Sequence, residues 1–193
     1  MKLKKLLLVI TSLALAFHLQ LAQAANPKVK METSKGTIII ELYPDKAPIS
    51  VANFLNYVKT GAYDGTIFHR VIKDFMNQGG GFTSDYEKVK TNDPITNEAD
   101  NGLKNLEFTV AMARTGEPHS ATNQFFINTK DNDFLDHTQK TTRGWGYAVF
   151  GKVVEGQNVV GAISRVATGA GGPFSSDVPR TPVIIEKVTV LEE

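Results

Sequence analysis

Apolar and polar residues alternate along much of the chain, and this pattern predicts mostly short strands. Two strand-like runs, 29–33 and 37–42, flank the polar segment Ser34-Lys35-Gly36, and apolar and polar residues alternate strictly in the first of them. A period of two is typical of a strand with one buried face, and a short glycine-containing connection favours a hairpin. Five further runs have a strand-like composition: 66–72, 106–114, 123–129, 147–153 and 183–191.

Two segments show the helical period instead. Pro48 begins the first, apolar residues follow at positions 51, 54, 55 and 58, and Gly61 is placed to end it. Residues 157–165 carry Val159, Val160 and Ile163 on one helical face. Polar loops rich in Gly and Asn occupy 79–105 and 166–182, and no repeat or linker divides the chain. Many strands with two helices predict a β-barrel or a β-sandwich that the helices close or cap.

The composition narrows the classes of function. With 193 residues, of which 41% are hydrophobic, the chain suits one globular domain and not a disordered protein. Zero cysteines exclude a disulfide framework, a thiolate nucleophile, a cysteine-ligated zinc site and an iron–sulfur cluster. The formal net charge of +1 is far from the basic excess that is typical of a nucleic-acid-binding protein.

The first 24 residues have the layout of a secretory signal peptide. Lysines near the N-terminus precede an apolar stretch, and Ala22 and Ala24 form an A-x-A pattern before Ala25. A membrane anchor is the alternative, but His18 and Gln20 interrupt the stretch before the length of about 20 residues that spans a bilayer. We expect cleavage after Ala24, a mature domain of residues 25–193, and a bacterial periplasmic location, which suits a chain without cysteine.

The segment 68–80 gives the first specific indication of function. It reads Phe-His-Arg-Val-Ile-Lys-Asp-Phe-Met-Asn-Gln-Gly-Gly and resembles the signature of the cyclophilins, which are peptidyl-prolyl cis–trans isomerases. Further blocks match in order at 36–43, 48–54, 112–113, 123–127, 134–136 and 149–153, so the resemblance covers essentially all of 28–191. It implies a mainly β fold, a closed eight-stranded antiparallel β-barrel capped by two α-helices, with a groove for prolyl peptides on its outer face.

The resemblance also implies roles for individual residues. Arg70 matches the catalytic arginine, and Gln78 and Gln124 match polar groups that hold this arginine or the peptide. We place Arg70 and Gln78 in the catalytic site and Gln124 among the substrate-binding residues. Ala113 lies on the strand that pairs with the substrate backbone. The remaining matches form the walls of the proline pocket: Phe75, Met76, Phe126 and Leu135.

Three substrate-binding positions depart from the common family pattern. Arg114 stands where many cyclophilins carry Asn, Phe134 where many carry Trp, and Tyr147 where many carry His. The loop 138–146 is longer than usual, and because Trp145 lies inside it, this residue does not replace the groove Trp. Cyclophilins that bind cyclosporin tightly tend to have the Trp, whose indole N–H donates to the ligand. Phe134 has no such donor, so we expect weak cyclosporin binding.

The reaction requires little chemical machinery. Rotation about an X–Pro bond is slow because the planar amide is stabilised by resonance, and a donor aimed at the prolyl nitrogen stabilises the twisted state. One arginine beside an apolar pocket meets this requirement without a nucleophile, a general base, a metal or a cofactor, and we expect none of these.

We read His69 as a hydrogen-bonded core residue, since period two puts Arg70 and Phe68 on one face and His69 on the other. By the same rule, one of Phe125 and Phe126 belongs to the core and the other to the groove.

These observations predict a periplasmic peptidyl-prolyl isomerase that acts on unfolded or partly folded, proline-containing exported polypeptides. We expect a monomer that binds neither nucleic acid nor, stably, a membrane. The main alternative is a proline-peptide binding module or holdase chaperone whose catalysis is incidental. A weaker alternative is an interaction scaffold that uses an acidic surface. Arg70 favours the enzyme, because a simple binding module does not need a donor at the prolyl nitrogen.

Overall fold

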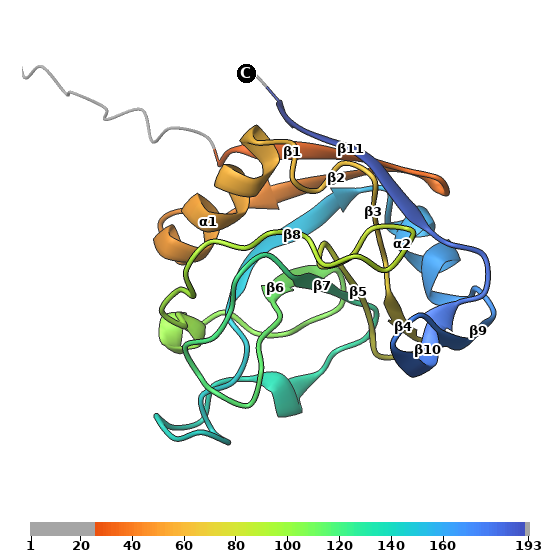
Figure 1. Cartoon of the computed structure of the whole chain (residues 1–193). Helices are drawn as coiled ribbons and strands as arrows, with labels where there is room; N and C mark the ends of the chain where they lie inside the picture. Colours follow the sequence, from red (N-terminus) through yellow and green to blue (C-terminus); the bar gives the residue numbers. More distant parts are fainter. Residues whose placement is uncertain (1–25, 192–193) are drawn as a thin grey trace, which may run out of the picture.

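Residues 26–191 are described in the computed structural model, and the expected signal peptide lies outside them. Two antiparallel sheets and two α-helices make up the domain (Figure 1). The strands are β1 (Lys28–Thr33), β2 (Gly36–Leu42), β3 (Thr66–Ile67), β4 (Arg70–Ile72), β5 (Met76–Gly79), β6 (Thr109–Met112), β7 (Phe125–Asn128), β8 (Val149–Glu155), β9 (Thr168–Gly171), β10 (Phe174–Pro179) and β11 (Ile184–Leu191). The helices are α1 (Pro48–Lys59) and α2 (Gln157–Ser164), with short 3-10 turns η1 (Ala99–Asn101) and η2 (Asp133–Leu135).

The main sheet is curled but open, and the prediction of a closed eight-stranded barrel is wrong. Its nine strands follow the order β3-β11-β1-β2-β8-β6-β7-β5-β4. The outermost strands, β3 and β4, are consecutive in the chain and are separated by Phe68 and His69, which belong to no strand. No ladder in the described chain pairs β3 with β4: β3 pairs with β11 and β4 with β5. Between them, the backbone N–H of Phe68 donates to the carbonyl of Val183 (2.9 Å).

The predicted strands and helices are largely confirmed, and the differences lie in non-local pairing. The expected strand 66–72 divides into β3 and β4. The expected loop 166–182 contains the β9–β10 hairpin, whose glycines and serines give no apolar alternation. This hairpin packs on the main sheet through Phe174, whose ring lies 5.5 Å from that of His69. A tertiary contact therefore stabilises strands that have little local preference for the conformation.

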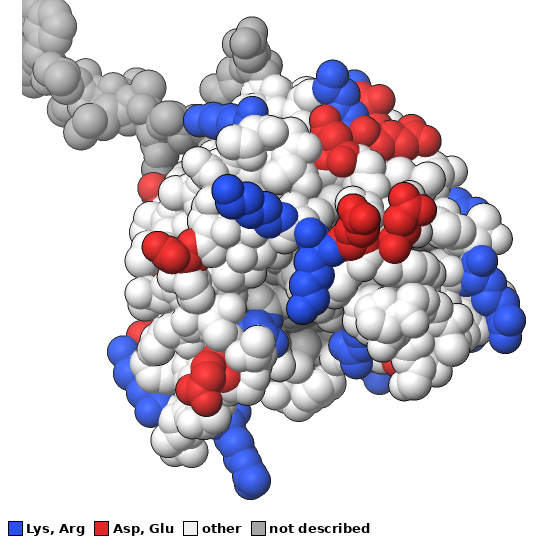
Figure 2. Space-filling model, in the orientation of Figure 1, with Lys and Arg blue, Asp and Glu red and all other residues white. Residues whose placement is uncertain are grey.

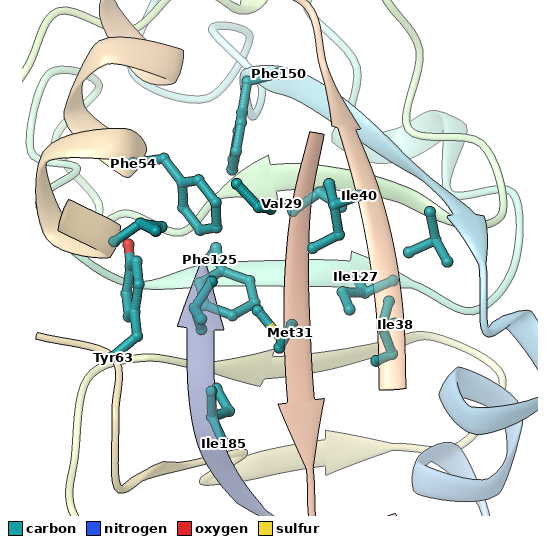
Figure 3. Close-up of a cluster of buried hydrophobic side chains, with 14 of the residues drawn as sticks. Val29, Met31, Ile38, Ile40, Phe54, Tyr63, Phe125, Ile127, Phe150 and Ile185 are labelled. Carbon is teal, nitrogen blue, oxygen red and sulfur yellow. The ribbon is translucent and has the colours of Figure 1, made fainter. Parts of the chain in front are cut away.

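The concave side of the sheet contains the main hydrophobic core (Figure 3). Strands β1, β2, β7 and β11 contribute Met31, Ile38, Phe125 and Ile185, and each of these side chains is buried. Helix α1 packs Phe54 against Phe125 with ring centroids 5.6 Å apart and an edge-to-face geometry. Such pairs are stabilised by the ring quadrupoles in addition to the burial of apolar area.

The two helices lie at opposite ends of the curled sheet and both bury one face in this core (Figure 1). Pro48 stands in the first turn of α1, where the missing N–H has no intrahelical partner to lose. Gly61 follows the C-cap with φ +68°, a left-handed conformation that ends the helix at the predicted place. Helix α2 begins after Gly156, which has φ +84°. Within residues 26–191, no helix is long and apolar enough to span a bilayer.

Candidate active site

Four neighbouring strands align one row of side chains on the outer face of the main sheet. The register pairs Arg70 of β4 with Gln78 of β5, Gln78 with Phe126 of β7, and Phe126 with Ala111 of β6. Residues that are directly opposite in antiparallel strands project from the same face of the sheet. The ladder therefore holds Arg70 and Gln78, which one turn connects, beside Phe126, which comes from a distant part of the chain.

This outer face has its own small hydrophobic cluster and a pocket. Met76, Phe126 and Leu135 are buried there, and Phe75 and Tyr147 pack against them. The pocket has a volume of about 110 Å³. Nine of the eleven residues that we predicted for the site line it: Arg70, Phe75, Met76, Gln78, Ala113, Arg114, Phe126, Leu135 and Tyr147. Gln124 and Phe134 lie beside this pocket and do not line it.

The neighbouring phenylalanines of β7 face opposite sides, as predicted. Phe125 is part of the inner core and Phe126 lines the outer pocket. The prediction that Phe68 shares a face with Arg70 is wrong, because Phe68 lies in the inner core, 6.1 Å from the Phe125 ring. The alternation rule assumes one continuous strand, and the chain leaves the sheet at Phe68 and His69.

Arg70 lies at the edge of the pocket, and its positive charge is not paired with an acidic side chain of residues 26–191. Its guanidinium carbon lies 6.0 Å from the centre of the Phe75 ring. None of the carboxylates in residues 26–191 forms an ion pair with it. Arg70 is half-buried, so its charge is partly removed from water but remains accessible from the pocket. Because a guanidinium does not titrate at neutral pH, it is a permanent hydrogen-bond donor.

Gln78 and Gln124 extend the polar part of the site. The side-chain amide of Gln78 donates to the carbonyl oxygen of Gln124 over 2.8 Å. Gly81 makes room for Gln124, since a Cβ at Gly81 would lie 2.6 Å from the Gln124 amide carbon. The expected polar loop 79–105 begins too early, because Gly79 belongs to β5, and Gly81 is required for this close approach.

A second, more polar pocket adjoins the first. It has a volume of about 190 Å³ and shares Gln78, Ala113 and Arg114 with the apolar pocket. Its other lining residues are Thr115, Ser120, Thr122 and Gln124. Gln124, which the sequence analysis assigned to substrate binding, thus belongs to this neighbouring pocket. The two pockets form one groove, apolar at one end and polar at the other.

Phe134 lies at the rim of the groove. It is 70% exposed, and its ring stacks on that of Phe75 with 5.6 Å between the centroids. The next residue, Leu135, points into the apolar pocket. Phe134 therefore extends the aromatic wall outward, at a place where a bulky ligand but not a single proline ring would meet it.

Three buried asparagines, Asn105, Asn128 and Asn132, hold the pocket wall, and no sequence pattern indicated them. Asn132 donates to the backbone carbonyl of Phe75 (2.9 Å) and to the side chain of Asn128 (2.8 Å). Asn128 in turn donates to Asn105 over 3.2 Å. These bonds tie the β4–β5 turn that carries Phe75 to the η2 turn that carries Leu135. Asparagine in a polar loop is common at surfaces, so no local sequence signal distinguishes these three.

His69 lies behind Arg70 and away from the groove. It is buried, and its ring packs between Phe82 and Phe174 at 4.8 and 5.5 Å. The pKa of His69 is lowered to about 4, mainly by burial and to a smaller extent by the charge of Arg70, and hydrogen bonding with Ile67 and Gln124 opposes this shift only partly. The Nδ1 atom has no hydrogen-bond partner within the described chain. The prediction of a core histidine is confirmed, but only part of its hydrogen-bonding capacity is used.

This fold and groove are those of a prolyl isomerase. The sequence model of the family described as "Cyclophilin type peptidyl-prolyl cis-trans isomerase/CLD" matches residues 28–190. The chain belongs to this family, and it is a peptidyl-prolyl cis–trans isomerase. Among solved structures, a cyclophilin-type isomerase of Cryptosporidium parvum has the same fold, with a TM-score of 0.67, 23% identity, and coverage of 87% of this chain and 99% of that one.

Bacterial relatives are considerably more similar in sequence. The isomerase cyp18 of Streptomyces antibioticus is 61% identical over 84% of this chain and 98% of its own length. Isomerase B of Escherichia coli strain K12 is 55% identical over 85% of this chain and 99% of its own. Isomerase A of Dickeya dadantii is 52% identical over 96% of both chains.

Proposed function

We propose that this isomerase accelerates X–Pro rotation in exported polypeptides, with Arg70 as the donor to the prolyl nitrogen and the apolar pocket as the proline site. The observation that supports this most directly is the position of Arg70. Its guanidinium has no acidic partner among residues 26–191 and borders a pocket walled by Phe126, Met76 and Leu135. A cation that paired with a carboxylate would be a weaker donor to the substrate.

The two parts of the site act on different properties of the twisted transition state. Twisting the amide removes its resonance and localises the lone pair on the prolyl nitrogen, where a guanidinium N–H can donate. The planar amide is the more dipolar form, so apolar walls disfavour it relative to the twisted one. Gln78, opposite Arg70 in the ladder, is held by Gln124 and supports the polar side of the groove.

The free energies involved are compatible with this division of roles between Arg70 and the apolar pocket. Uncatalysed exchange takes about 10–100 s, so millisecond turnover requires four to five decades, or about 5.5–7 kcal/mol. A charge-assisted hydrogen bond from Arg70 contributes about 1.5–3 kcal/mol of this. Desolvation and positioning in the pocket supply the remainder, which is why the arginine and the apolar walls must occur together.

Replacing Arg70 tests the proposal. We expect Arg70→Ala to lower kcat/KM for an X–Pro peptide by one to two decades, or about 1.4–2.7 kcal/mol, with the fold intact because Arg70 lies outside the core. Arg70→Lys should recover little, since an ammonium lacks the planar, directed donors of a guanidinium. NMR exchange spectroscopy on a short prolyl peptide measures the rate, and Arg180→Ala, which removes an exposed arginine outside both pockets, is the matched control. Full activity of Arg70→Ala would refute the proposed role of Arg70 as the donor.

The pH dependence gives an independent test. No proton moves in the proposed mechanism, and arginine does not titrate in the neutral range. We expect kcat/KM to be nearly constant from about pH 6 to 8.5 and insensitive to chelators. A bell-shaped profile, or inhibition by EDTA, would contradict the mechanism.

The exported context rests on residues 1–24, which lie outside the described residues. The alignment with the Escherichia coli relative covers 99% of that protein but only 85% of this chain, whereas the alignment with the Dickeya relative covers 96% of both chains. This difference supports an N-terminal extension that only some relatives share, and its charge and apolar pattern support a signal peptide. Expression in a Gram-negative host, fractionation and mass measurement of the product are the test: we expect periplasmic protein that begins at Ala25. A cytoplasmic product that retains Met1 would refute this part of the proposal.

A further inference from the structure

Arg114 is held rigidly between the two pockets. Its Nε donates to the carbonyl of Gly146 (3.0 Å), and its Nη1 donates to the carbonyls of Thr115 (2.9 Å) and Gly116 (3.3 Å). The guanidinium also lies over the Tyr147 ring, with its carbon 4.6 Å from the ring centre. Three backbone carbonyls and one aromatic face therefore fix the orientation of this cation before any ligand arrives.

The same bonds leave one edge of the guanidinium free. Arginine has five N–H donors, and the three bonds above use those of Nε and Nη1. Nη2 has no hydrogen-bond partner within residues 26–191, and none of the ion pairs found there involves Arg114. The nearest acid in the sequence, Glu117, is exposed and is not paired with it. Arg114 thus lacks both a charge partner and a partner for two donors.

The groove as a whole carries positive charge without compensation. Arg70 and Arg114 both line the apolar pocket, and neither pocket has an acidic lining residue. On the face that Figure 2 shows, basic and acidic side chains are mixed. Where ion pairs occur in the described part of the chain, they lie outside the groove, as between Lys140 and Asp100 (2.8 Å).

The hydroxyl groups of the second pocket are largely used within the protein. Thr115 donates to the hydroxyl of Ser120 (2.8 Å), and Ser120 donates to the backbone carbonyl of Glu117 (2.7 Å). Their donors are therefore not available to a ligand without breaking these bonds. Arg114 is the charged residue that lines the second pocket, and its Nη2 is not used by any of these bonds.

We propose that Arg114 determines substrate specificity, and that the groove prefers prolyl peptides with an acidic residue two or three positions from the proline. The inference rests on the proposed use of this groove by the substrate. Because Arg114 lines both pockets, a peptide with its proline in the apolar pocket passes this residue as it enters the second. Extended chains advance about 3.3 Å per residue, so a side chain two or three positions away reaches the polar pocket. A carboxylate there accepts from Nη2 in a charge-assisted bond.

A matched peptide series tests this preference. Glu, Gln or Lys is placed two or three positions from the proline, on either side of it, and kcat/KM is measured by NMR exchange or a coupled assay. Gln has the shape of Glu without its charge, so the Glu/Gln ratio isolates the electrostatic contribution. We expect a ratio of about three to ten on one side of the proline, because a preorganised, partly desolvated pair exceeds a typical surface ion pair. Lys should be the poorest of the three.

Variants of Arg114 separate the effect of its charge on the Glu/Gln ratio from the effect of its hydrogen bonds to the backbone carbonyls. In Arg114→Gln we expect the Glu/Gln ratio to fall to about one, whatever happens to the absolute rate. Arg114→Lys retains the charge but loses the fork that binds three carbonyls, so an intermediate ratio is expected. Lys59→Gln, which removes an exposed positive charge outside both pockets, should leave the ratio unchanged. Raising the salt concentration to about 1 M, where the Debye length is about 3 Å, should reduce the ratio in the unmodified protein.

The outcomes are distinguishable from a failure of the proposed function. If neutral peptides are isomerised and the Glu/Gln ratio is one at every position, the specificity proposal is wrong while the Arg70 mechanism remains. The same holds if the ratio persists in Arg114→Gln, because another group would then be the source of the preference. A protein with no activity on any peptide would instead refute the assignment of the groove.

Discussion

Strands β4, β5, β7 and β6 present two rows of side chains, one residue apart in sequence and opposite in character. The inner row consists of Val71, Asn77, Ile127 and Val110, and all four are buried. The outer row consists of Arg70, Gln78, Phe126 and Ala111. The polar member of the inner row, Asn77, donates its side-chain amide to the carbonyl of Val160 in α2 over 3.0 Å, whereas its Oδ1 has no hydrogen-bond partner among residues 26–191. The cation of the outer row has no acidic partner among the described residues.

The difference between the two rows shows that the same four hydrogen-bonded strands contribute to stability on one face and to catalysis on the other. The inner row is part of the core and fixes the backbone of all four strands. The outer row takes its position from that backbone, so Arg70 is held in place without needing partners that would weaken it as a donor. Substitutions in the inner row should therefore affect unfolding, and substitutions in the outer row should affect turnover.

The largest effect is expected from truncating Phe125, the inward-facing one of the two neighbouring phenylalanines of β7. Phe125 is fully buried against Phe54 and Tyr63, with ring centroids at 5.6 and 5.5 Å. We expect Phe125→Ala to lower the free energy of unfolding by about 3–5 kcal/mol, since it leaves a closed cavity. Urea denaturation followed by circular dichroism measures this loss.

Phe126→Ala is the matched comparison. Phe126 is 4% exposed and borders the pocket, so the space it leaves opens to water. We expect a smaller loss of stability than for Phe125→Ala, but a reduction of kcat/KM by about tenfold or more, because apolar contact worth about 1.5 kcal/mol or more is lost to the proline ring. If Phe125→Ala and Phe126→Ala lose the same stability and Phe126→Ala keeps its kcat/KM, the expected difference between the inner and outer faces of the sheet is wrong.

The next effect concerns acid stability and His69. The pKa of His69 is about 4 in the folded protein, below the value of about 6.5 for the unfolded chain. Above pH 6.5 the imidazole is neutral in both states and has no effect on the pH dependence. As the pH falls from 6.5 to 4, the unfolded chain binds a proton that the folded protein does not, so stability decreases by up to about 3 kcal/mol.

His69→Phe isolates this contribution. The substitution retains an aromatic ring between Phe82 and Phe174 and removes the titration. Other groups titrate equally in both proteins, so the difference between their free energies of unfolding should change with pH mainly between 6.5 and 4. Urea denaturation at several pH values measures it, and a constant difference would show that His69 is not the group responsible.

The smallest effect is expected at the rim of the groove. Phe134 has no hydrogen-bond donor in its side chain, and we expect this protein to bind cyclosporin weakly. Phe134→Trp adds an indole N–H and should tighten cyclosporin binding by about 0.5–1.5 kcal/mol, the contribution of one ordinary hydrogen bond. The peptide rate should change little, because Phe134 does not line the proline pocket. Titration of activity with cyclosporin decides this, and equal inhibition constants for both proteins would contradict it.

Much of the site was predictable because the segment 68–80 and the later matching blocks resemble the cyclophilins. The segment 68–80 alone supplies Arg70, Phe75, Met76 and Gln78 through one turn between β4 and β5. Strand alternation separated Phe125 from Phe126. The asparagines that hold the pocket wall could not be recognised, because Asn132 acts on Phe75 across 57 positions of the chain. Their role depends on burial, which no local pattern revealed.

The sequence by itself determined the period of most strands and the limits of both helices, and its resemblance to the cyclophilins indicated the segment that carries the arginine. The strand periods and helix limits depend on the conformational preferences and apolar spacing of neighbouring residues. Only the tertiary structure decided that the sheet stays open between β3 and β4, that Phe68 turns into the core, and that β9 and β10 form a hairpin. It also decided the orientation of Arg114, whose Nε donates to a carbonyl 32 positions away. Contacts between distant segments form only once the chain is folded, so their geometry depends on the packing of the whole molecule.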